Sequence, residues 1–356
     1  MTLIQEASRP APPVARQQGL RVVAIGGGTG LSTLLRGLKR HVAAPTGTQP
    51  PIDPGCPDAP CLIRDLTAIV TVTDDGGSSG RLREDLHVPP PGDVRNCLVA
   101  LSEDEHLLSR LFQFRFDTGE LQGHSFGNLF LAALSQINGG DFSHAVQMSS
   151  QILATRGRIY PATNTNVTLA ALMDDGSLVS GETNITASKQ RIVELMLEPA
   201  DALPLSETLE AIQAADLITM GPGSLYTSLI TNLLVRGIPD ALAASKATRV
   251  YVCNLMTQAN ESLGLTASQH IERILQHAGP TKRPIFDYAL INTAPISPTL
   301  LAQYAREGQT PITPDLDRIR SLGVEPITGN FAHEDGVLRH DYDKVTDCLL
   351  KLALPH

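Results

Sequence analysis

Short runs of hydrophobic residues alternate with longer amphipathic segments along most of this chain. Runs over residues 20–25, 67–73, 217–220, 249–253 and 288–292 are rich in β-branched residues, and helix-like stretches lie between them, among them 31–38, 93 to past 101, and 126–137. Strands that alternate with helices are typical of βαβ units. The pattern therefore predicts an α/β fold with a mainly parallel sheet flanked by helices.

Three regions depart from this repeat. Residues 167–173 and 178–185 alternate in polarity on either side of Asp174, Asp175 and Gly176, which predicts a hairpin and hence a small antiparallel β patch at about 157–198, as a lobe or a lid. Closely spaced prolines at about 43–62 exclude a regular strand and indicate an insertion. Residues 1–19 are expected to be a disordered tail, and 20–352 a single α/β domain.

A glycine-rich turn, Gly26 to Gly30, follows the first predicted strand and precedes a helix. Glycines in such a turn let backbone N–H groups at the helix N-terminus approach a phosphate. The turn is neither a Walker A loop nor a dinucleotide fingerprint, because Leu31 stands where the third glycine of the latter belongs. A second strand, glycine turn and helix start at Gly221 to Ser224 repeat the arrangement. The candidate phosphate ligands are Gly27, Gly28, Thr29, Gly30, Gly223 and Ser224, with a ligand-free tight turn as the alternative.

Two carboxylates, Asp74 and Asp75, follow the second predicted strand. Ligands of open parallel sheets bind beyond the carboxyl ends of the strands, so this loop should lie beside the first glycine turn. Carboxylates there are suited to bind ribose hydroxyls, to hold Mg²⁺ or to act as a base. Successive side chains of an extended segment point in opposite directions, so we expect the two residues to have different roles. A turn in which they bond their own backbone is the alternative.

Further polar residues cluster where helices start and strands end. Asp93 alone would be an ordinary helix cap, but Arg95 and Asn96 beside it add groups that recognise phosphates or hydroxyls. A second cluster, 124–128, leads into the helix over 126–137, and polar residues follow the strand over 249–253. The candidate ligand-binding residues from these clusters are Asp93, Arg95, Asn96, Asn128, Asn254 and Thr257.

Composition narrows the classes of function. The 356 residues carry a formal net charge of -9, which disfavours nucleic acid as a partner, and aromatic residues make up only 4% with no Trp, which disfavours a base-stacking surface. No run approaches the roughly 18 apolar residues of a membrane-spanning helix. The first residues lack the apolar core of a secretory signal. We therefore expect a cytoplasmic protein that does not act at a membrane.

Five motifs in this order resemble the gluconeogenesis factor (YvcK-like) family, within the superfamily of 2-phospho-L-lactate transferase (CofD-like). They are Gly26-Gly27-Gly28-Thr29-Gly30-Leu31, Thr71 to Gly80 with Thr73-Asp74-Asp75-Gly76-Gly77 at its centre, Pro91-Gly92-Asp93-Val94-Arg95-Asn96-Cys97, His124-Ser125-Phe126-Gly127-Asn128 and Met220-Gly221-Pro222-Gly223-Ser224. The resemblance covers about 20–352 apart from the insertion. It implies a Rossmann-like fold, a cytoplasmic location, a homodimer, and binding of a UDP-sugar, notably UDP-N-acetylglucosamine. It also implies a link to cell shape and envelope synthesis during gluconeogenic growth.

The resemblance also assigns expected roles to single residues. The two glycine turns would surround the phosphates of the nucleotide. Arg339 lies in Leu338-Arg339-His340-Asp341, which matches a family motif whose arginine is implicated in UDP-sugar binding. Asp74 or Asp75 matches the acidic position that approaches substrate and metal in the transferase relatives.

The leading hypothesis is a regulator that binds a UDP-sugar without turnover and acts through protein partners that the sequence does not identify. The rival hypothesis is an enzyme that transfers a phospho-lactyl or phosphoenolpyruvyl group from a nucleotide diphosphate to a hydroxyl acceptor. Its catalytic residues would be Asp74 and Asp75, and Asp75 would be a ligand of Mg²⁺, the one cofactor expected. The 2-phospho-L-lactate transferase that this superfamily is named for acts in deazaflavin coenzyme synthesis. The scarcity of aromatic residues in this chain makes a stacking pocket for a flat deazaflavin acceptor less favourable. An oxidoreductase that uses NAD or NADP ranks third, because the third glycine is missing.

Overall fold

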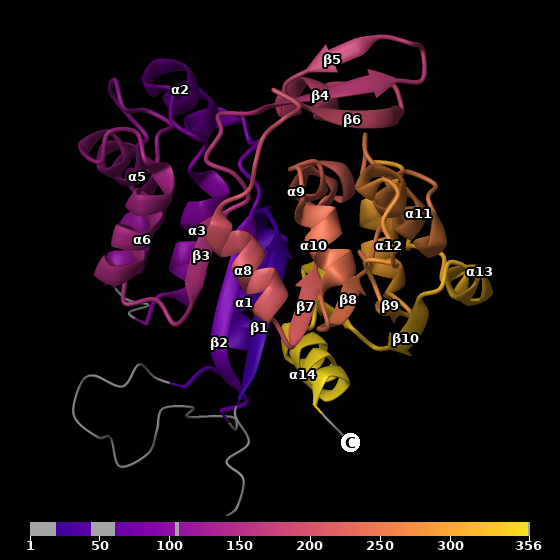
Figure 1. The fold of residues 1–356 in the computed structure, drawn as a ribbon. Helices are drawn as coiled ribbons and strands as arrows, with labels where there is room; N and C mark the ends of the chain where they lie inside the picture. The colour runs from indigo at the N-terminus through magenta and orange to yellow at the C-terminus, as the bar shows by residue number, and fades with distance from the viewer. Residues whose placement is uncertain (1–18, 44–60, 104–106, 355–356) are drawn as a thin grey trace, which may run out of the picture.

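A computed structural model of the chain describes residues 19–43, 61–103 and 107–354. They form one large parallel sheet flanked by helices, with two small antiparallel sheets, and this confirms the predicted fold class (Figure 1). The predicted tail over 1–19 and the insertion over 43–62 fall almost entirely outside the described residues.

The large sheet has seven strands in the order β10-β9-β8-β7-β1-β2-β3, and every neighbouring pair is parallel. The strands are β1 (Leu20–Gly26), β2 (Ile63–Val70), β3 (Arg158–Pro161), β7 (Leu217–Met220), β8 (Thr248–Val252), β9 (Tyr288–Asn292) and β10 (Glu325–Gly329). The chain starts at β1, builds β2 and β3 on one side, and then returns to add β7 on the other side. The strand order therefore reverses between β1 and β7, which is where open parallel sheets bind their ligands.

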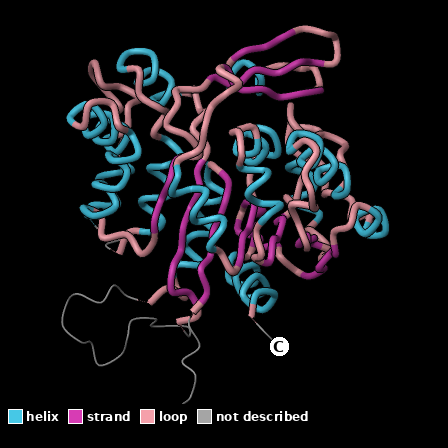
Figure 2. Tube along the Cα trace, in the orientation of Figure 1, coloured by secondary structure: helices cyan, strands magenta, loops and turns pink. Residues whose placement is uncertain are grey.

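Helices cover both faces of this sheet (Figure 2). The helices are α1 (Gly28–Lys39), α2 (Gly77–Leu86), α3 (Gly92–Leu101), α4 (Leu107–Gln113), α5 (Phe126–Ile137), α6 (Phe142–Ile152), α7 (Glu182–Ala187), α8 (Ser206–Ala214), the π-helical turn η1 (Leu225–Ile230), α9 (Thr231–Leu233), α10 (Ile238–Ala244), α11 (Ala267–Ala278), α12 (Pro298–Ala305), α13 (Leu316–Ser321) and α14 (Tyr342–Ala353). The crossover from β1 to β2 and the crossover from β7 to β8 run in opposite directions along the sheet. Because crossovers between parallel strands are right-handed, α1 in the first and α10 in the second lie on opposite faces. Within the described ranges no helix combines the length and the apolar character needed to span a bilayer.

The core is centred on β1, which is buried on both faces. Val22 to Gly26 are all buried, as expected of a strand that helices cover on both sides. On α1, the side chains of Leu31, Leu34, Leu35 and Leu38 are fully buried at helical spacing, and the helix packs against α3 and α14. This packing fixes the start of α1, and hence the first glycine turn, above the carboxyl end of β1.

The second strand lies earlier in the sequence than predicted, over Ile63–Val70 rather than 67–73. Its partner β1 ends at Gly26, which is paired with Val70, and the N–H of Thr71 donates the last hydrogen bond to the Gly26 carbonyl. Both strands that flank β2, β1 and β3, make their last pair with Val70. Residues 71–76 therefore leave the sheet and form a loop at its carboxyl edge.

The antiparallel patch is a three-stranded sheet of order β5-β4-β6, which we call the overhanging sheet: β4 (Thr168–Met173), β5 (Leu178–Ser180) and β6 (Ile192–Glu198). The predicted hairpin over β4 and β5 is present, but its second arm is shorter than the expected 178–185, because Gly181, at a φ of 92°, turns the chain into α7. The sheet lies at the end of the molecule where the carboxyl ends of β1 and β7 point (Figure 1). A second small sheet of β11 (Ala332–Asp335) and β12 (Val337–His340) leads into α14.

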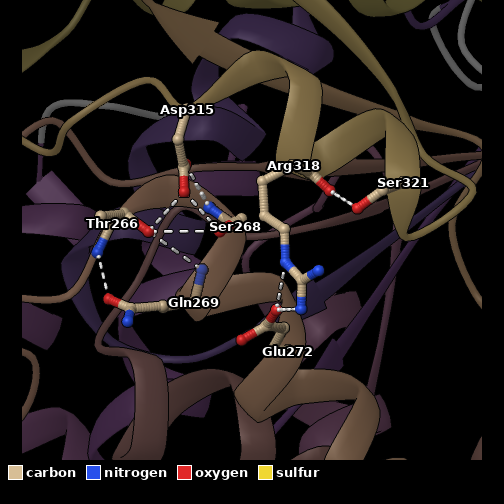
Figure 3. Close-up of polar contacts among 7 residues, drawn as sticks. All are labelled: Thr266, Ser268, Gln269, Glu272, Asp315, Arg318 and Ser321. Atoms are coloured by element: carbon tan, nitrogen blue, oxygen red, sulfur yellow. Dashed lines mark hydrogen bonds and ion pairs between the residues drawn. The ribbon is translucent and has the colours of Figure 1, made fainter.

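Polar contacts fix the start of α11 (Figure 3). Thr266 caps the helix and forms a capping box with Gln269. The carboxylate of Asp315 accepts hydrogen bonds from the hydroxyl of Thr266 at 2.8 Å and from the N–H of Ser268 at 2.8 Å. Burial alone would raise the pKa of Asp315, but the hydrogen bonds from Ser268 and Thr266 outweigh burial and lower it. We call these residues the Asp315 cluster.

Candidate functional site

A cleft of about 990 Å³ opens at the carboxyl ends of β1 and β7, where the strand order reverses. We call it the switch-point cleft. The predicted site residues that line it are Gly27, Gly28, Thr29, Gly30, Asp74, Asp93, Arg95, Asn96, Gly223, Ser224, Asn254, Thr257 and Arg339. The fold thus brings residues from six separate segments to one cavity, while their roles in binding stay predictions.

The two glycine turns, Gly26 to Gly30 and Gly221 to Ser224, contact each other, and residues of both line the cleft. Gly28 has a φ of 62°, which favours glycine. A Cβ added to Gly30 would lie 2.3 Å from the carbonyl oxygen of Pro222 in the second turn, so only glycine allows this approach. The start of α1 therefore lies against the turn after β7, and the residues of the first turn line the cleft at a helix N-terminus, a position that is suited to bind an anion.

Asn254, which follows β8, holds the second glycine turn in place. Its amide donates to the carbonyl of Gly223 at 2.8 Å and accepts from the N–H of Gly223 at 3.3 Å. Gln258 donates from its amide to the hydroxyl of Ser224 at 3.1 Å. Ser224 makes no side-chain cap to η1, although the helical turn begins at Leu225 as predicted. Asn254 and Gln258 therefore shape the turn that would contact the phosphates.

Two carboxylates, Asp74 and Asp93, line the β2 side of the cleft. Asp74 accepts a hydrogen bond from the N–H of Gly76 at 2.9 Å. Asp93 lies in the first turn of α3 but makes no cap to it, because the helix begins after Pro91. Burial and the neighbouring charge of Asp74 raise the pKa of Asp93 to about 6, although a hydrogen bond from the backbone of Gly28 and the charge of Arg95 act in the opposite direction.

Asp75 and Asn128 do not line the cleft. The carboxylate of Asp75 accepts hydrogen bonds from the N–H and the hydroxyl of Thr183, at 2.8 and 2.6 Å, at the start of α7. Its side chain thus points away from the cleft that Asp74 lines, while the roles of both residues stay predictions. Asn128 is buried behind the cleft, where its amide donates to the hydroxyl of Ser79 at 3.4 Å. Neither position is suited to direct ligand contact in this arrangement.

Four guanidinium groups also line the cleft: those of Arg36, Arg95, Arg115 and Arg339. Burial lowers the pKa of Arg95 and the charge of Arg115 lowers it further, while Asp93 and Asp74 oppose the shift. The Nε of Arg95 is buried and has no hydrogen-bond partner within the described ranges. Arg36 and Arg339 are exposed on the far side, next to Tyr342, and neither forms a hydrogen bond or ion pair with another described residue. Unpaired guanidinium groups are suited to bidentate binding of phosphates.

Sequence reasoning missed Arg36, Arg115, Glu182 and Gln258, which also line the cleft. Arg36 had a readable signal, since Thr29, Ser32, Thr33 and Arg36 form a polar stripe at helical spacing along α1. Glu182 has no such signal, because the alternation over 178–185 predicts a strand there. Arg115 lies after α4 and outside any motif, so only the fold shows that it faces the cleft.

A site for Mg²⁺ can be tested on the donor atoms of the cleft. Among residues 19–43, 61–103 and 107–354, no three His, Cys, Asp or Glu side chains come together as a metal site. Mg²⁺ is, however, commonly held by one or two carboxylates together with the phosphates of a substrate. Asp74 and Asp93 have the oxygen donors for this arrangement and line the same side of the cleft. Asp75, the metal ligand expected from the sequence, points toward Thr183 instead.

Comparison with known proteins places the chain among close relatives. Residues 22–332 match the family described as 2-phospho-L-lactate transferase CofD. A protein of Halalkalibacterium halodurans named gluconeogenesis factor is 48% identical over 93% of this chain and 95% of its own length. The gluconeogenesis factor of Bacillus subtilis is 44% identical over 93% of this chain and 98% of its own length. A Bacillus halodurans crystal structure of the UPF0052 family has a TM-score of 0.84 and 47% identity, covering 93% of this chain and 99% of that one.

Proposed function

Since this chain belongs to the CofD family, we propose that it is a regulatory protein of the gluconeogenesis-factor type that binds a nucleotide sugar, with UDP-N-acetylglucosamine as the expected ligand. The relatives' shared name supports a role in growth on gluconeogenic carbon sources. On this proposal the bound ligand reports the supply of envelope precursors and links carbon flow to cell shape. The ligand is bound and released unchanged, and the signal passes to protein partners.

The observation that carries this proposal is the meeting of two glycine turns, from β1 and β7, in one cleft with four arginines. A single turn is enough for one phosphate at a helix N-terminus. Two turns in contact, with Arg95 at one side and Arg36 and Arg339 at the other, suit a diphosphate whose two ends extend in opposite directions. A nucleoside diphosphate sugar has this form, and a volume of about 990 Å³ is at the upper end of the range for small-ligand sites.

The test is calorimetric titration of the full chain with UDP-N-acetylglucosamine, UDP-glucose, GDP and NAD, each with and without Mg²⁺. We expect saturable, selective binding of the UDP-sugars, and mass spectrometry after long incubation should recover them intact. Absence of saturable binding at millimolar UDP-sugar would overturn the proposal. Preference for GDP, or consumption of the ligand, would instead support an enzyme.

One observation favours transferase activity as a second candidate function. Asp93 faces the cleft with a pKa raised to about 6, which is suited to a group that accepts a proton from an attacking hydroxyl near neutral pH. Asp93 would stay free to accept the proton, and Asp74 would hold Mg²⁺ together with the phosphates, whose charge the ion would neutralise. Product formed from a nucleotide diphosphate and a hydroxyl acceptor, and lost in Asp93→Asn, would establish this activity. Unchanged product formation in Asp93→Asn would exclude Asp93 as the base.

A further inference from the structure

The helix α7, which follows β5 of the overhanging sheet, contributes one charged side chain to the switch-point cleft, that of Glu182. Glu182 is the first residue of α7 and is half-buried. Gly181, with a φ of 92°, reverses the chain after β5 and so directs α7 back toward the large sheet. The carboxyl group thereby reaches a cavity whose other acidic residues, Asp74 and Asp93, belong to the Rossmann-like body.

Contacts with Asp75 fix the position of this helix start. Its carboxylate accepts hydrogen bonds from the N–H and the hydroxyl of Thr183, the residue after Glu182. The approach is close, since a Cβ added to Gly181 would lie 2.7 Å from Oδ2 of Asp75. We call these contacts the Asp75 clasp. Because Asp75 is adjacent to Asp74, the clasp ties the position of Glu182 to the loop that carries the acidic side of the cleft.

The surroundings of Glu182 determine its chemistry. Burial, and then the charges of Asp74 and Asp93, raise its pKa to about 9. In either protonation state the carboxyl group accepts hydrogen bonds from hydroxyl groups. A carboxyl group beside two other acids is a poor partner for a phosphate. It is suited to the hydroxyl and carbonyl groups of a sugar.

The rest of the cleft indicates which part of a nucleotide sugar lies there. Apolar groups line the opposite side, after β8 and on β12, where Leu255, Met256 and Val337 offer a surface for a base. The glycine turns between the two sides would hold the diphosphate. The glycosyl group of the nucleotide sugar would then lie on the side of the cleft that Asp74, Asp93 and Glu182 line.

We propose that Glu182 recognises the glycosyl group of the bound nucleotide sugar, and that Asp75 and Thr183 are positioning residues that hold Glu182 at the cleft. This inference rests on the proposed function and names the part of the ligand that the overhanging sheet selects. It also gives Asp75 a task that explains why its side chain points away from the cavity. Discrimination between a nucleotide sugar and its free nucleotide would then come from the overhanging sheet.

The test compares the affinities of UDP-N-acetylglucosamine and UDP for the wild-type chain and its Glu182 variants by calorimetry. Loss of one or two hydrogen bonds predicts about a five- to tenfold weaker affinity of Glu182→Ala for UDP-N-acetylglucosamine, with little change for UDP. Glu182→Gln should recover most of the affinity, because its carboxamide also donates and accepts. The matched control is Glu194→Gln, an exposed residue of β6 in the same sheet, which should bind both ligands like the wild type.

The clasp is tested separately with Thr183→Val, which lacks the hydroxyl, and Thr183→Ser, which retains it. Thr183→Val should show the same selective loss at a smaller size, and Thr183→Ser should bind like the wild type. Circular dichroism and thermal melting verify that each variant folds. Equal losses for both ligands would place Glu182 at the ribose instead and overturn the inference, as would unchanged affinities. Absence of any nucleotide binding by the wild-type chain would overturn the proposed function itself, which separates the two failures.

Discussion

Half-buried carboxyl groups in two regions of the molecule have pKa values that are shifted in opposite directions. In the Asp315 cluster, hydrogen bonds from Ser268 and Thr266 outweigh the effect of burial and lower the pKa of the carboxyl group. In the switch-point cleft, burial and neighbouring carboxylates raise the pKa of Asp93 to about 6 and that of Glu182 to about 9. The ionised carboxylate is therefore stabilised in the Asp315 cluster and destabilised in the switch-point cleft.

On the proposed function, the difference separates residues that stabilise the fold from residues that bind a ligand. Asp315 has its partners within the chain, since it joins the start of α11 to the segment before α13. In the cleft, Asp74 and Asp93 each accept a backbone hydrogen bond, from Gly76 and Gly28, but the pKa of Asp93 stays raised. The buried Nε of Arg95 has no partner among described residues. Unfavourably placed charged groups that cluster in a cavity are typical of functional sites. The comparison predicts that variants at the two places affect different measurements.

Removing the Asp315 carboxylate should have the largest effect on stability. Asp315→Ala leaves the N–H of Ser268 and two hydroxyls at the start of α11 without their acceptor. Loss of a charged cap predicts a decrease of about 2–3 kcal/mol in the free energy of unfolding, measured by urea denaturation. Binding of UDP-N-acetylglucosamine should stay unchanged. The control is Asp317→Ala in α13, whose exposed side chain contacts only Arg320 on its own helix and should change stability little.

Arg339 should show the reverse behaviour. Its side chain is exposed on β12 and makes no hydrogen bond or ion pair with a described residue, so Arg339→Ala should change the free energy of unfolding by less than about 0.5 kcal/mol. Loss of a guanidinium–phosphate contact should weaken binding of UDP-N-acetylglucosamine by about tenfold or more. The matched control is Arg318→Ala, which breaks an ion pair with Glu272 far from the cleft. Equal affinity of Arg339→Ala and wild type would remove Arg339 from the site.

Much of the fold could be predicted from the sequence, because its elements have strong local signals. The buried runs of β1, β7, β8 and β9 and the apolar stripe of α1 identify the parallel sheet. The glycine turns indicate both sides of the switch point. The end of β2 could not be predicted from local signals, because β2 ends where its neighbour β1 ends and no longer provides hydrogen-bond partners. The short edge strands β3 and β10 were missed, since each has only four or five residues and pairs on one side.

The site residues that belong to a motif at the end of a strand could be predicted from the sequence. Those that lie in other segments of the chain could not. Asp74 and Asp75 are adjacent, and only the fold shows that one faces the cleft and the other faces Thr183. Arg115 and Glu182 come from segments that no periodicity connects to the sheet. Their position depends on tertiary packing of α4 and of the overhanging sheet.

Substitution of Asp93 gives the sharpest contrast with Asp315, although its effect is smaller. The folded-state pKa of Asp93 is raised to about 6 from an ordinary 3.8, so its ionisation destabilises the fold. This penalty is fully present above about pH 6 and disappears toward pH 4. Asp93→Asn cannot ionise, and its free energy of unfolding should exceed that of the wild type by about 1–2 kcal/mol at pH 8, with no difference near pH 4.

Asp315→Asn should show the opposite sign over the same pH series. Because the pKa of Asp315 is lowered in the folded state, its carboxylate stabilises the fold above the ordinary value of 3.8, and this contribution is lost as the pH falls through the lowered pKa. Urea denaturation of both variants at half-unit steps from pH 3 to pH 8 measures the two effects together. If Asp93→Asn were less stable than the wild type at pH 8, the carboxylate would be a stabilising group like Asp315. The two regions would then stabilise a carboxylate alike, and the contrast drawn from their pKa values would be wrong.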